Sequence, residues 1–63
     1  MNAMEIVSEY TELCINELNT NELMQNDIKE KKIGNICAIY EDCSEGYMTI
    51  HEAMFTIAKV RGV

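Results

Sequence analysis

The chain has 63 residues, of which 48% are hydrophobic, and its five basic and eleven acidic residues give a formal net charge of −6. A chain of this length forms one small domain, expected to span residues 1–63, and buries only about 60% of the surface that its unfolded form exposes. The acidic balance argues against direct binding to nucleic-acid phosphates or to an anionic membrane, because both need clustered Lys and Arg. No apolar run approaches the roughly 18 residues of a membrane span.

The cysteines Cys14, Cys37 and Cys43 are an odd number. The chain begins Met-Asn-Ala-Met-Glu, without the basic first region of a signal peptide, so no disulfide framework is expected. These features predict a reduced, cytoplasmic protein. Cys14 and Cys37 fall on apolar helix faces, where a free thiol behaves as a small hydrophobe. Cys43 falls in a polar connection and is expected to be exposed.

The first segment, about residues 2–18, has the cleanest helical pattern in the chain. On one side of this predicted helix, Glu5, Glu9 and Glu12 line up one turn apart. Residues 1–28 carry acidic side chains and no basic ones. This acid ridge is either a solvated face or a contact surface for a basic partner. The other side is apolar at three- and four-residue steps: Ala3, Ile6, Val7, Tyr10, Leu13, Cys14 and Leu18.

A turn is predicted near Asn19-Thr20, and Asn19 is predicted to cap the start of a second helix. Asn19 and Glu22 have the spacing of a capping box, with Asn19 as the cap residue and Glu22 as the carboxylate three positions later. The apolar edge of this helix contains Leu23, Met24 and Ile28. Its end is marked by basic residues and a glycine, which are Lys29, Lys31, Lys32 and Gly34.

The continuation of this helix has more than one interpretation. On a helical wheel, the apolar residues between 33 and 43 centre roughly 150° away from those between 23 and 28. We therefore predict a break or sharp kink at Lys32-Asn35, with Asn35 capping a short helix to about Asp42. A continuous helix is the alternative if its two faces bury against different neighbours, one of them a second subunit. A β-hairpin with arms at residues 36–40 and 47–50 is less favoured, because residues 36–40 do not alternate.

The last third of the chain is predicted to form a terminal helix. A glycine turn at Gly46 precedes Thr49 and Glu52, which have the spacing of a capping box. Phe55 and Val60 fall outside the main apolar stripe, so this helix is apolar on more than one side. Such a helix is either enclosed or carries a second face for a partner. The main stripe contains Ile50, Ala53, Met54, Ile57 and Ala58.

Residues 41–52 resemble a degenerate EF-hand loop. With Glu41 as the first position, Gly46 falls on the turn glycine, and Thr49 and Glu52 fall on the ninth and twelfth positions. Glu41 stands where Asp is normal, and Cys43 places a soft sulfur where a hard cation prefers oxygen. A glycine turn followed by a capping box produces the matching half without a metal. The resemblance implies a divalent-cation module as an alternative function.

Residue patterns for catalysis are weak. Cys37, Cys43 and His51 do not have the spacing of a zinc site. His51 is the single histidine and is predicted to lie in the first turn of the terminal helix. A histidine at such a position typically has a half-exposed side chain and takes no part in catalysis. The sequence contains neither a phosphate-binding glycine loop nor a G-x-S-x-G motif. We expect no enzyme activity, no cofactor and no metal.

The sequence therefore predicts an all-α domain, a compact bundle of three to four short helices. We expect a homodimer formed through the terminal helix and a face containing Ile36 and Tyr40. The expected function is that of a small acidic interaction module, a regulator or a phage- or mobile-element-encoded inhibitor that binds a host protein, such as a nucleic-acid-acting or defence enzyme. A structural assembly subunit is a further alternative. The expected partner-binding residues are Glu5, Glu9, Glu12, Met54, Phe55 and Val60.

Overall fold

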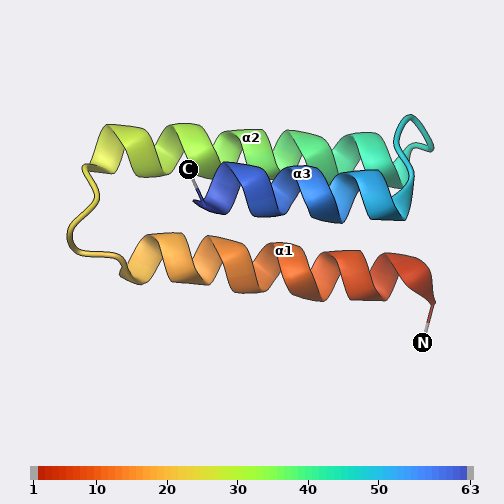
Figure 1. Ribbon diagram of the computed structural model, residues 1–63, viewed down its shortest axis with the longest axis horizontal. Coiled ribbons are helices and arrows are strands. Elements are labelled where there is room, and N and C mark those ends of the chain that lie inside the picture. The colour runs from red at the N-terminus through yellow and green to blue at the C-terminus, as the bar shows by residue number, and fades with distance from the viewer. Residues whose placement is uncertain (1, 63) are drawn as a thin grey trace.

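The computed structural model describes residues 2–62, which fold into three helices. Helix α1 spans Ala3–Thr20, α2 spans Asn26–Ser44 and α3 spans Ile50–Gly62. The helices run up, down and up, with the α1–α2 connection at one end of the bundle and the α2–α3 connection at the other (Figure 1). Each helix packs against both of the others. The predicted all-α class is confirmed, and residues 2–62 contain no β-hairpin.

The turn between the first two helices lies later than the sequence pattern predicted. The Thr20 hydroxyl donates to the carbonyl of Asn16 at 3.0 Å, so Thr20 fits within the last turn of α1 instead of ending it. The side chain of Asn21 then accepts from the backbone N–H of Leu23 at 3.0 Å, which forms an Asx turn. The predicted helix start at Asn19 is therefore wrong, and α2 begins at Asn26.

The predicted break or kink at Lys32-Asn35 is also wrong, because α2 continues without interruption through these residues. The prediction assumed that Leu23 and Met24 belong to the helix and set the direction of its first half. Both residues lie in the connection before α2, where Leu23 is 97% exposed and Met24 packs onto the core from the loop. With these two residues removed from the wheel, the buried side of α2 is set by Ile36 and Cys43.

Gly34 lies in the interior of α2, so its replacement by alanine is expected to stabilise the protein. A Cβ atom at Gly34 would meet no atom within 4 Å. The gain should be about 0.7 kcal/mol, because alanine is the better helix former and restricts the unfolded chain. Urea denaturation followed by circular dichroism measures this change.

Gly46→Ala provides the control for that substitution. Gly46 has a φ of +88°, a backbone conformation that alanine adopts only with strain, so this variant should lose stability. A loss of stability in Gly34→Ala as well would contradict a continuous α2 and would favour a break at this position.

The predicted start of the terminal helix is confirmed at the atomic level. The backbone N–H of Glu52 donates to the Thr49 hydroxyl at 3.1 Å, and that hydroxyl donates to the Glu52 carboxylate at 2.9 Å. The N–H of Thr49 also points to the same carboxylate, at 3.4 Å. These contacts satisfy N–H groups that a helix start leaves without partners, and such a cap contributes about 1 kcal/mol.

The core consists of two groups of buried side chains along the bundle axis. One group joins Val7, Cys43 and Ala53, and the other contains Cys14, Leu18, Ile36 and Ile57. Each group draws residues from all three helices. Ile36 is fully buried at the centre of the second group. The predicted dimer face at Ile36 and Tyr40 therefore lacks Ile36, because that side chain already contacts α1 and α3.

Candidate functional site

Phe55 is the large apolar side chain of α3 that the fold leaves most open to solvent, at 67% exposure. It lines a hollow of about 390 Å³ with Thr56, Lys59 and Val60. The Lys59 ammonium lies 5.5 Å from the centre of the Phe55 ring, a cation–π distance. The hydroxyl of Thr56 donates to the Glu52 carbonyl at 2.7 Å, so it is satisfied within the helix. The surface here is consequently apolar with a positive edge.

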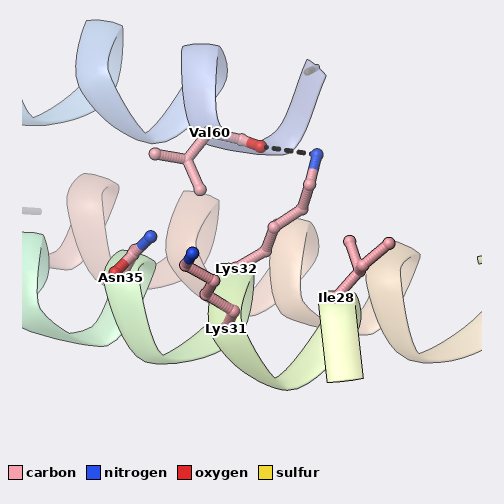
Figure 2. A pocket seen from close by; sticks show the side chains of 5 residues that line it. All are labelled: Ile28, Lys31, Lys32, Asn35 and Val60. Carbon is pink, nitrogen blue, oxygen red and sulfur yellow. Dashed lines mark hydrogen bonds between the residues drawn. The ribbon is translucent and has the colours of Figure 1, made fainter. Parts of the chain in front are cut away.

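A second hollow, of about 380 Å³, lies between α2 and α3 and shares Val60 with the first. Figure 2 shows Lys32 reaching from α2 to α3, where its ammonium donates to the Val60 carbonyl at 3.1 Å. This bond supplies a cation and a donor to a carbonyl in the last turn of α3. It also holds the two helices together at this position. The residues that line the hollow are Ile28, Lys31, Lys32, Asn35 and Val60.

A third hollow of about 450 Å³ continues this surface toward the α1–α2 connection, sharing Ile28 and Lys32 with the second. Leu23 and Met24 contribute its apolar side chains. Because adjacent hollows share lining residues, we treat the three as one surface. We call it the α2–α3 groove after the second hollow, the one of the three whose lining residues come from both helices. Its residues are Asn21, Leu23, Met24, Gln25, Ile28, Lys31, Lys32, Asn35, Phe55, Thr56, Lys59 and Val60.

The charge of the α2–α3 groove is opposite to that of the whole chain. Lys31, Lys32 and Lys59 line it, and among residues 2–62 no carboxylate does. The other two basic residues are Lys29, which lines none of the three hollows, and Arg61. Three of the five basic side chains thus line one partly apolar surface of a protein with a net charge of −6.

Arg61 is engaged elsewhere, at the contact between α1 and α3. Its guanidinium donates to the Glu17 carboxylate at 2.8 Å, and this hydrogen bond raises the pKa of Arg61. Tyr10 lies in the same region, and burial raises the pKa of its hydroxyl above the ordinary value of 10.0. The hydroxyl is therefore neutral at physiological pH. This region contributes to packing between α1 and α3.

The structure places five of the six predicted partner-binding residues on two separate surfaces and the sixth, Met54, against the core. Phe55 and Val60 line the same hollow on α3, and Val60 is also half-buried and packs against the core group around Ile36. Met54 is half-buried, lines none of the groove hollows and packs against the core group around Val7. The three glutamates of the acid ridge, Glu5, Glu9 and Glu12, are exposed on α1 and line no part of the α2–α3 groove.

Glu12 instead lines a smaller hollow of about 280 Å³ between α1 and α2, together with Tyr40 and Thr11. Thr11 is only 7% exposed, and its hydroxyl has no hydrogen-bond partner among the described residues. A buried hydroxyl without a partner is a cost to stability.

The lysines of the groove were missed by sequence reasoning. In the sequence, Lys31 and Lys32 have the pattern of basic residues at a helix end, and they are far from Phe55. Only the tertiary contact of α2 with α3 brings them to the same surface. One signal was present, since Phe55 and Lys59 are four residues apart and therefore adjacent on a helix.

The residues of the EF-hand resemblance do not form a twelve-residue loop. Glu41, Asp42, Cys43 and Ser44 lie in the last turn of α2, and the connection to α3 is residues 45–49. Within the described part of the chain, no group of three or more His, Cys, Asp or Glu side chains is placed to hold a metal ion. The predicted exposure is wrong for two of the cysteines, since Cys43 is buried beside Met4 and Cys37 is exposed, whereas Cys14 is buried as predicted.

No protein-family model, curated protein or solved structure matches the chain. Within residues 2–62, no helix has both the length and the apolar character needed to span a bilayer. Residues 2–62 form an all-α three-helix bundle with an apolar, lysine-lined surface centred on the hollow between α2 and α3.

Proposed function

We propose that this protein is a small acidic interaction module that binds another polypeptide through the α2–α3 groove. The observation that carries the proposal is the position of Phe55, an aromatic side chain 67% exposed at the edge of a hollow. Exposed apolar side chains grouped around a concavity are typical of interaction sites. Large aromatic residues that fill a pocket on a partner supply much of the binding energy of protein interfaces.

The module acts by occupying a surface of its partner and performs no reaction. It is a regulator or an inhibitor of a host protein, encoded by a phage or mobile element, and it works in the cytoplasm. The support is its small size, its lack of a recognisable catalytic motif and its three free thiols, which suit a reducing compartment. The exposed acid ridge of Glu5, Glu9 and Glu12 on α1 supports a second contact, which would steer a partner with a basic region.

Site-specific photo-crosslinking in the cells that produce the protein tests this proposal. A photoreactive phenylalanine derivative in place of Phe55, which keeps an aromatic ring at this position, is expected to give one discrete adduct with another protein, identified by mass spectrometry. The same amino acid in place of Tyr47, which is exposed but lines none of the groove hollows, is the matched control. Equal adducts from both positions, or none from position 55, would reject the proposal. An adduct with a second copy of the chain would favour the assembly subunit.

A further inference from the structure

We propose that the occupant of the α2–α3 groove is an acidic, amphipathic helix of the partner protein. This inference rests on the proposed function and names the chemistry of the partner at that site. It differs from the expectation based on net charge, which favours a basic partner for the chain as a whole.

The shape of the groove fits a helix. Two helices that pack side by side leave a depression between them, and a third helix with an apolar stripe fits such a depression. Here the depression has an apolar residue from each helix, Ile28 on α2 and Val60 on α3, with Phe55 beyond Val60. The Ile28 side chain is 42% exposed, so a ligand can contact it without displacing the core.

The charges at the groove select an acidic ligand. Lys31 lies on α2 and Lys59 on α3, so positive side chains border the apolar residues from both helices. Both lysines are exposed, and neither forms an ion pair with another described residue. The acidic residues nearest to them in sequence, Asp27, Glu30 and Glu52, line none of the three hollows. Carboxylates on both sides of the apolar stripe of a ligand helix would meet these lysines.

A polypeptide fits this groove better than a nucleic acid does. Binding to phosphates draws its strength from many basic contacts, whereas this groove has three lysines on a chain with a net charge of −6. One of them, Lys32, already donates to the Val60 carbonyl. The apolar side chains of the groove contribute to binding only if the ligand also has an apolar face.

Titration with designed peptides tests the inference. The probe is a stapled helical peptide of about 16 residues, long enough for four turns, with leucines at three- and four-residue steps and glutamates on both sides of them. Two further peptides carry glutamine or lysine in place of glutamate. Amide chemical shifts of the labelled protein are followed by NMR during each titration. The glutamate peptide is expected to bind most tightly, with shifts concentrated around Ile28, Lys31, Val60 and Phe55.

Charge-neutralising variants connect that preference to the lysines. Combining Lys31→Gln with Lys59→Gln is expected to weaken binding of the glutamate peptide about fivefold, as the loss of two exposed ion pairs implies. Lys29→Gln is the control, because Lys29 is on the same helix but outside the groove. Each of these substitutions changes an exposed or half-exposed side chain, and circular dichroism confirms that each variant folds.

Several results would overturn the inference. They are equal binding of the three peptides, tighter binding of the lysine peptide, shifts centred on α1, or equal weakening by Lys29→Gln. If the amide chemical shifts of groove residues change with protein concentration in the absence of peptide, the groove binds a second copy of the chain instead. If a partner crosslinks at position 55 while the glutamate peptide does not bind, the proposed function stands and only the acidic-helix inference fails.

Discussion

Replacing Ile36 with alanine is expected to lower the free energy of unfolding by about 3 kcal/mol, the typical cost of truncating a fully buried aliphatic side chain. Ile36 is fully buried and belongs to the core group that contains Cys14, Leu18 and Ile57. The cavity left by the substitution would open at the point where all three helices meet. A domain of this size has only a few kcal/mol of stability, so most of it should be lost. Urea denaturation monitored by far-UV circular dichroism gives the difference.

The matched control for this substitution is Ile28→Ala. It removes the same atoms from the same helix, but Ile28 is 42% exposed in the groove. Its loss should be well under half of that for Ile36→Ala. Equal losses would mean that Ile28 is enclosed in solution, which would contradict an open groove in the free protein.

Replacing Thr11 with valine is expected to raise the free energy of unfolding by about 1.5 kcal/mol, because it removes a buried hydroxyl without a partner and keeps the shape of the side chain. Thr11 is 7% exposed and lines the hollow between α1 and α2, and its hydroxyl has no partner among the described residues. Valine and threonine have similar helix propensities, so the change reports mainly on the hydroxyl. Thermal unfolding monitored by circular dichroism measures the effect as a higher midpoint.

Thr56→Val makes the same chemical change where the hydroxyl has a partner. Thr56 is half-buried on α3 and donates to the Glu52 carbonyl at 2.7 Å. This variant should gain nothing or lose slightly. A lower unfolding midpoint for Thr11→Val would show that the Thr11 hydroxyl is hydrogen-bonded in solution, contrary to the structure.

The elements that sequence reasoning predicted best are those with both a clear apolar period and a chemical start signal. The apolar residues of α1 recur from Ala3 to Leu18, and α3 has a glycine turn followed by the capping box of Thr49 and Glu52. These signals depend on residues close together in the chain, so they can be read without tertiary information.

The start of α2 was misjudged because two local signals competed. Asn19 and Glu22 have capping spacing, but Asn21 forms the turn and Thr20 bonds back to the preceding helical turn. If Leu23 and Met24 are assigned to the helix, the apolar residues of its first and second halves point to opposite sides. This apparent disagreement is the reason for the predicted break. Gln25, the residue at the true cap position, makes no side-chain capping bond and gives no sequence signal.

The candidate site was predicted in part. Phe55 and Val60 were singled out because they fall outside the apolar stripe of their own helix, a local property. The lysines beside them come mainly from another helix, and their position depends on how α2 packs against α3. Net charge does not reveal the sign of this surface, since an average over the chain hides a local cluster of opposite sign.

Replacing Phe55 with serine tests most directly whether its exposed aromatic side chain contributes to binding of the partner protein. The measurement is the affinity of the partner crosslinked at position 55 for the unmodified protein and for the Phe55→Ser and Tyr47→Ser variants, all purified. We predict at least about tenfold weaker binding for Phe55→Ser, equivalent to about 1.4 kcal/mol, and unchanged binding for Tyr47→Ser. Equal affinities of a folded Phe55→Ser variant and the unmodified protein would contradict a binding role for the α2–α3 groove.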